Sequence, residues 1–141
     1  MSEPRSAIAR FVRAVAEIER VDGGGADAEV AARVVMRLHR ELSNLIGPAG
    51  FDVLLARSLV LARRTRPALA EVKAGPAGAL TGLDGSRDAA LGEGAIALVA
   101  YFIDLLATLI GEDLAIALVR KVWPAVEEEE DNYEATQSHD P

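Results

Sequence analysis

Few residues in this chain have the types and spacing that chemistry requires. The sequence has no Cys and two His, of which His39 lies within LHRELSNLIG and His139 lies near the C-terminus. Without Cys there are no disulfides, thiolate nucleophiles or Cys-ligated metal sites. One usable His, with no HExxH or Glu-x-x-His pair, supports neither a zinc site nor a di-iron site. We therefore predict no metal site and no cofactor.

His39 carries one specific hypothesis. A phosphotransfer domain uses one exposed His on a four-helix bundle, and a Lys and a small residue typically follow that His. Here Arg40 and Glu41 follow instead. Leu38 and Leu42 have the spacing of inward-facing positions, which places His39 on the flank of its helix. We expect a surface or ion-paired His and keep phosphotransfer through His39 as an alternative function.

Asp104 is the one charged residue in the apolar stretch 95–110. Desolvation in a cleft would raise the pKa of such a carboxyl, and a carboxyl with a raised pKa can act as a general acid or base. One acid without a partner motif does not make an active site. We therefore expect Asp104 to lie at the edge of the fold or to pair with Arg57 or Arg63.

Nucleophile and phosphate-binding motifs are also missing from the sequence. Ser43 and Ser58 are isolated hydroxyls without a GxSxG pattern. The glycine-rich segments 23–25 and 75–85 do not match GxxxxGK[ST] and do not follow a strand. The sequence thus indicates a protein that is not an enzyme.

Two groups of arginines are candidates for binding a partner. The first is a stripe at helical spacing, and the second gathers at the end of the next helix: Arg33, Arg37 and Arg40; Arg63, Arg64 and Arg66. The simplest interpretation is a solvated face that pairs with Glu29 and Glu41. The alternatives are binding to an acidic partner surface and binding to the chain's own acidic C-terminus. Trp123, beside Pro124, is either a lid on the core or an interface anchor.

The net charge of −7 is concentrated at the C-terminus. Residues 127–141 hold seven of the 22 acids and no Lys or Arg, so residues 1–126 carry 15 acids against 15 bases. A neutral domain is a poor candidate for nucleic-acid binding, which depends on neutralising phosphates. We predict a domain over 1–126 and an acidic, disordered tail over 127–141.

Hydrophobic periodicity predicts helices, with glycines and prolines as their boundaries. The expected helices cover about 3–21, 27–46, 51–64, 91–110 and 112–123, with a short turn at 67–72 and a loop at 74–85. Ser2, Asp27 and either Asp84 or Ser86 are the expected N-caps. Gly111 is expected to end one helix before the next, with a kinked single helix as the alternative. Gly92 and Gly94 are expected to allow a neighbour to approach closely.

The predicted inward faces follow from the same spacing. They comprise Ile8, Phe11, Val12, Val15 and Ile18; Val30, Val34, Leu38, Leu42 and Leu45; Phe51, Leu54, Leu55, Leu59 and Ala62; and Leu114, Ala115, Leu118 and Val122. Val53, Val60 and Leu61 widen the apolar surface of the third helix.

The stretch 91–110 is apolar on all sides and must therefore be surrounded by other helices or by lipid. Its segment 95–110 would span about 24 Å, less than the roughly 30 Å of a hydrocarbon core. We therefore predict an all-α fold, a compact antiparallel bundle of four to five helices around this central helix. Membrane insertion of 95–110 remains a second alternative.

These observations favour a small non-enzymatic protein–protein interaction module, an adaptor or regulator. The many Leu, Ile and Val positions favour a homo-oligomer, preferably a dimer, and a further protein partner. The N-terminus lacks the apolar core of a signal peptide, so we expect a cytoplasmic protein. The strong preference for Arg over Lys, with abundant Ala and Gly, suggests a bacterial GC-rich genome.

Overall fold

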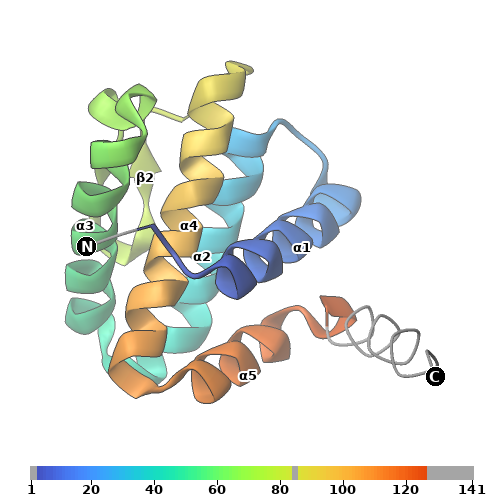
Figure 1. Cartoon of the computed structure of the whole chain (residues 1–141), viewed down its shortest axis with the longest axis vertical. Helices are drawn as coiled ribbons and strands as arrows, with labels where there is room; N and C mark the ends of the chain where they lie inside the picture. Colours follow the sequence, from blue (N-terminus) through green and yellow to red (C-terminus); the bar gives the residue numbers. More distant parts are fainter. Residues whose placement is uncertain (1–2, 84–85, 127–141) are drawn as a thin grey trace.

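The computed structural model describes residues 3–83 and 86–126, and over this range the chain is predominantly helical (Figure 1). The predicted all-α class is thereby confirmed. The predicted tail, 127–141, lies outside the described residues. The elements are α1 (Ser6–Gly23), α2 (Asp27–Ile46), α3 (Pro48–Thr65), η1 (Pro67–Glu71), β1 (Lys73–Ala74), η2 (Pro76–Gly78), β2 (Leu80–Thr81), α4 (Ala89–Ile110) and α5 (Glu112–Val122).

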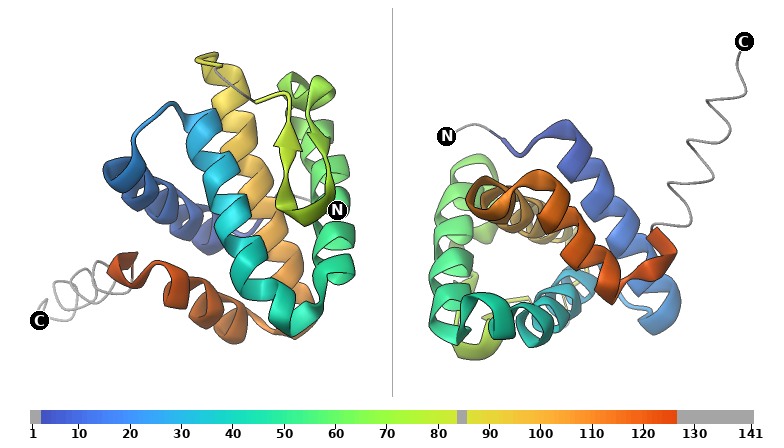
Figure 2. Two further views of the ribbon diagram at one scale, coloured as in Figure 1. Left: turned by 180° about the vertical axis from the view of Figure 1, so that it is seen from behind. Right: turned by 90° about the horizontal axis from the view of Figure 1, so that it is seen from below.

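Helix α4 occupies the centre of the molecule, as its uniform apolarity predicts. Figure 1 shows α4 between α3 on one side and α2 and α1 on the other, and Figure 2 shows α5 crossing below it. Within the described residues α4 alone is long and apolar enough to cross a membrane, but 61% of its most apolar window is buried in the fold. A core helix of a soluble protein has the same length and apolarity.

Two glycines let other elements lie close to the first part of α4. A Cβ atom at Gly92 would lie 2.8 Å from the Cβ of Asp27, and one at Gly94 would lie 3.0 Å from the Cγ of Leu69. Both distances are tighter than normal packing allows. The expected close approach at these glycines is confirmed.

The helix boundaries correct several predicted caps. Asp27 is the first residue of α2 rather than its N-cap, and the N-cap is Ala26, which makes no side-chain cap bond. Asp88 caps α4, because its carboxylate accepts a hydrogen bond from the Leu91 N–H at 3.1 Å. Ser86 instead accepts a hydrogen bond from the backbone N–H of Asp88 at 3.3 Å. The other expected caps, Ser2 and Asp84, lie outside the described residues.

Helix α3 begins at Pro48, three residues earlier than predicted. Gly47, with φ of +80°, ends α2, and proline at the next position starts a new helix because its missing N–H needs no partner there. Gly111, with φ of +98°, likewise separates α4 from α5. The predicted break at Gly111 is therefore confirmed, and the kinked single helix is wrong.

The segment predicted as a loop contains a short hairpin. β1 pairs antiparallel with β2 through Lys73 with Thr81 and Ala74 with Leu80. Two-residue strands leave too little periodicity to be seen in a sequence. The predicted turn before them is confirmed as η1, whose Leu69 is buried.

The predicted inward faces are largely buried, although Ile18, Leu118 and Val122 are only half-buried. Leu45 at the end of α2 and Leu114 on α5 are exposed. On α5 the buried residues are Ala115 and Val119. Successive helical residues differ by about 100°, and the short α5 touches the core along one narrow line, so Leu114 turns outward.

Candidate functional site

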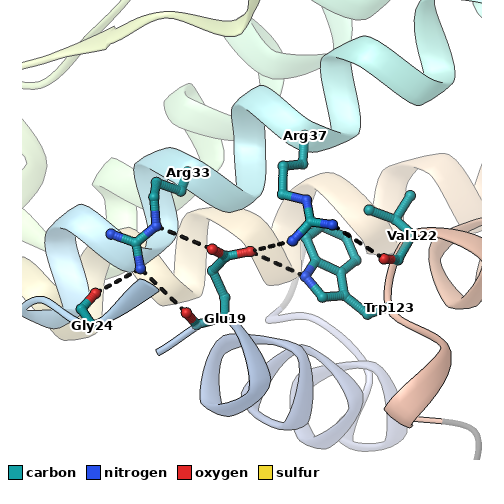
Figure 3. A network of polar contacts seen from close by, with 6 residues as sticks. All are labelled: Glu19, Gly24, Arg33, Arg37, Val122 and Trp123. Carbon is teal, nitrogen blue, oxygen red and sulfur yellow. Dashed lines mark hydrogen bonds and ion pairs between the residues drawn. The ribbon is translucent and has the colours of Figure 1, made fainter. Parts of the chain in front are cut away.

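The strongest polar cluster of the fold surrounds Glu19, a residue that the sequence did not single out. Glu19 lies on α1 and is buried. Its Oε2 accepts a hydrogen bond from Arg33 Nε at 3.1 Å, and its Oε1 accepts bonds from Arg37 Nη1 at 2.8 Å and from Trp123 Nε1 at 3.2 Å (Figure 3). One carboxylate therefore links α1, α2 and the residue that follows α5.

The two arginines also bind backbone carbonyl groups at the edge of this cluster. Arg33 Nη2 donates to the carbonyl of Gly24 at 2.6 Å and to that of Glu19 at 3.3 Å. Arg37 Nη2 donates to the carbonyl of Val122 at 3.5 Å, and its guanidinium lies 5.1 Å from the centre of the Trp123 ring. The carbonyls of Gly24 and Val122 lie at helix ends, where they have no helical partners of their own. Arg33 and Arg37 thus each bind a carbonyl group at a helix end.

The Glu19 carboxyl has a pKa below its ordinary value of 4.5. Burial raises the pKa, but hydrogen bonds from Arg37, Arg33 and Trp123, together with the charge of Arg37, lower it by more. Glu19 is therefore a buried anion that is fully matched by cations and donors. Such a group stabilises a structure and is poorly suited to exchange protons near neutral pH.

The three arginines of the predicted stripe, Arg33, Arg37 and Arg40, have different environments in the fold. Arg33 and Arg37 pair with Glu19, and the expected partners Glu29 and Glu41 are wrong. Of the three arginines, only Arg40 is exposed. The error has a physical cause, because Glu19 comes from another helix and its position could not be read from spacing within α2.

The second arginine group is similarly divided. Arg63 Nε donates to the carbonyl of Leu69 at 3.3 Å and its Nη2 donates to that of Val72, so this residue anchors η1. Arg64 is exposed. Arg66 is half-buried, and its Nε atom is buried without a hydrogen-bond partner. Arg63, Arg64 and Arg66 therefore do not form one exposed basic patch.

Trp123 is only 2% exposed, and it is the largest fully buried side chain. Its indole N–H is satisfied by Glu19. These facts match the interpretation of Trp123 as a lid on the core. An anchor for a partner would need an exposed ring.

His39, on α2, is half-buried against α3 and the segment that contains η2. Its ring makes an edge contact with Phe51, with centroids 4.9 Å apart, and a Cβ atom at Gly78 would lie 2.9 Å from the His39 Cβ. The Nε2 atom is buried and has no hydrogen-bond partner. A phosphotransfer His needs an accessible ring nitrogen, and Nε2 does not provide one.

Asp104 is buried and pairs with Arg5, not with the expected Arg57 or Arg63. Its Oδ1 lies 3.4 Å from Arg5 Nη1 and accepts a bond from the Arg5 backbone N–H at 3.3 Å. The carboxylate therefore holds the start of α1 against α4. The hydroxyls of Ser43 and Ser58 donate to the carbonyls of His39 and Leu54, as isolated helical serines do.

An apolar groove of about 620 Å³ lies between α3 and the end of α4. Arg57 is the only charged residue in its lining, which otherwise consists of Ile46, Ala49, Gly50, Val53, Leu54, Leu105, Thr108 and Leu109. Two of these lining residues are largely exposed to solvent, Val53 at 70% and Leu109 at 69%. Exposed large apolar side chains around a hollow are typical of an interaction site.

The sequence carried a signal for this groove that we did not connect with a site. We expected Val53, Val60 and Leu61 to widen the apolar surface of the third helix. Leu61 is buried, but Val53 and Val60 are exposed. A helix with more apolar surface than its own fold covers has a second face, and that face is a candidate site.

A smaller hollow of about 410 Å³ lies between α1 and α4. Its rim mixes Arg13 and Arg66 with Glu3, Asp27 and Glu93. This mixture of charges does not select one class of ligand. Within residues 3–83 and 86–126, no group of three or more His, Asp or Glu side chains is placed to hold a metal ion.

Comparison of the chain with protein-family models, curated proteins and solved structures finds no match.

Proposed function

We propose that this protein is a small non-enzymatic interaction module that associates with itself and with another protein through the face of α3 and the end of α4. The observation that carries the proposal is the apolar groove with Val53 and Leu109 exposed beside it. Large apolar side chains in water cost free energy, and a protein surface that covers them recovers it.

The use of the polar residues supports the non-enzymatic part of the proposal. Glu19, Arg33 and Arg37 bind one another, and Asp104 binds Arg5. A catalytic group must instead lie free to reach a substrate. The apolar groove offers contact area and no reactive group, as a docking surface does.

The two alternative functions receive less support. Phosphotransfer at Nε2 of His39 would require this buried atom to become accessible. Membrane insertion of α4 would require the fold to open around a helix whose apolar window is mostly buried. A cytoplasmic location and the absence of nucleic-acid partners remain predictions from composition.

Light scattering coupled to size exclusion tests the proposal over a range of protein concentrations. The chain has a mass of 14.9 kDa, and we expect twice this mass at the upper end of the range. Val53→Glu places a charge in the groove and should weaken association by at least about 100-fold. Val21→Glu is the matched control, because Val21 is 76% exposed on α1 and does not line the groove.

The control should keep the mass of the unaltered chain at every concentration. Self-association through another surface would leave Val53→Glu as heavy as the control, and this result would overturn the assignment of the groove. A mass of one chain at every concentration would overturn the self-association.

A further inference from the structure

The outward face of α3 carries a regular seam of apolar residues. Ala49, Val53, Ala56 and Val60 are all exposed and follow one another at steps of four, three and four. This spacing is the one by which two helices pack along a common line. The residues of α3 that face the core form a separate set, which consists of Phe51, Leu54, Leu55, Ser58, Leu59, Leu61 and Ala62.

The seam has two unlike halves. Ala49 and Val53 line the groove beside α4, whereas Ala56 and Val60 do not. The first half is therefore part of a hollow, and the second half stands outside it.

The seam is complementary to its own reversed copy. If a second α3 runs in the opposite direction about a point between residues 54 and 55, Val53 meets Ala56 of the other copy and Ala49 meets Val60. Every layer then contains one valine and one alanine, and this evenness suits close packing. Parallel pairing in register would alternate wide valine layers with narrow alanine layers.

The same reversal matches the two halves of the seam. The groove half of each copy lies against the half of the other copy that stands outside its own groove. None of the four seam residues is charged, and antiparallel helices also oppose their dipoles favourably. Side-chain size and the opposed helix dipoles therefore both favour an antiparallel second copy over a parallel one.

We propose that the groove binds a second copy of this chain, with the two α3 helices antiparallel about a two-fold axis between residues 54 and 55. This inference rests on the proposed function and adds the direction and register in which the two copies pack. The resulting interface is isologous, with the same patch used by both copies.

Single-cysteine variants test the register, because the chain has no Cys of its own. Ala49→Cys and Val60→Cys lie on exposed positions, and the two chains can be given different masses by a tag. In the proposed dimer Ala49 meets Val60, whereas two copies of Ala49 are separated by about 16 Å along the helix. A disulfide needs Cα atoms within about 7 Å.

We expect mild oxidation of the mixture to give the mixed disulfide dimer and each variant alone to give almost none. Val21→Cys mixed with Val60→Cys is the matched control and should stay monomeric on a non-reducing gel. Cross-linking of Ala49→Cys with itself would overturn the antiparallel arrangement. A mixture that does not cross-link would overturn the register.

Light scattering separates these failures from failure of the proposed function. A dimer that Val53→Glu dissociates, but that does not form the mixed disulfide, keeps the docking surface and contradicts the register. A chain that is monomeric without oxidation and forms no mixed disulfide contradicts both the self-association and the register.

Discussion

The Glu19 cluster and the α3–α4 groove differ in what the fold leaves free. Around Glu19, two arginines and the Trp123 indole bind one buried carboxylate. At the groove, Val53 and Leu109 remain exposed to water. Most of the polar residues that suggested function therefore hold the structure together, and apolar residues that the fold leaves uncovered form the candidate site. In this molecule, apolar surface that the fold leaves exposed is a better guide to function than the presence of charged residues.

The largest expected effect is the loss of stability in Glu19→Ala. Removing the carboxylate leaves Arg33 and Arg37 without their common anion, and loss of one partner of a buried ion pair costs about 3–5 kcal/mol. Both arginines are about one-third exposed, so water compensates them in part and we expect about 3 kcal/mol. Urea unfolding followed by circular dichroism measures the change, with Glu17→Ala as the control because Glu17 is exposed on the same helix. Equal losses in the two variants would contradict the role of Glu19.

Acid should weaken the same contacts. The pKa of Glu19 is lower in the folded chain than its ordinary value, so the folded state binds fewer protons there and stability rises with pH. The contribution is present above the unfolded pKa and is lost as pH falls through the folded pKa. Glu19→Gln cannot titrate, so the difference in unfolding free energy between the unaltered chain and this variant should shrink as pH is lowered from 7 to 3. A constant difference would show that the charge of Glu19 contributes nothing.

A smaller effect is expected from Trp123→Phe. The change removes the indole N–H that donates to Glu19 and keeps an aromatic ring in the core. Loss of one hydrogen bond to a charged group costs about 1.5–3 kcal/mol, and we expect the lower end because Arg33 and Arg37 still bind the carboxylate. Repeating the change in Glu19→Gln completes a double-mutant cycle, and we expect Trp123→Phe to cost less in that background. Additive effects would mean that the two side chains do not interact.

The central helix could be predicted because its signal is local. The run 95–110 is so apolar that no arrangement in water leaves it uncovered, and the breaks at Gly47 and Gly111 require only local backbone geometry. The partner of Asp104 could not be predicted, because Arg5 is 99 residues away in the sequence. Glu19 was missed for the same reason, since its partners come from α2 and from beyond α5.

The groove could be predicted from the sequence only in part. Ala49, Val53, Ala56 and Val60 already share one helical face in the sequence, and Phe51, Leu55 and Leu59 share another. Periodicity shows that both faces are apolar but does not show which face the fold covers. That choice depends on how α3 packs against α2 and α4, which is a property of the whole chain.

The most direct test of the account measures molar mass and unfolding free energy together for Glu19→Gln and Val53→Glu. Unfolding is measured at a dilution where the unaltered chain is monomeric, because association itself adds apparent stability. We predict that Glu19→Gln lowers the unfolding free energy and keeps the dimer mass at high concentration. Val53→Glu should give the mass of one chain and change the unfolding free energy by less than about 0.5 kcal/mol. A stable dimer of Val53→Glu, or loss of the dimer in folded Glu19→Gln, would contradict the account.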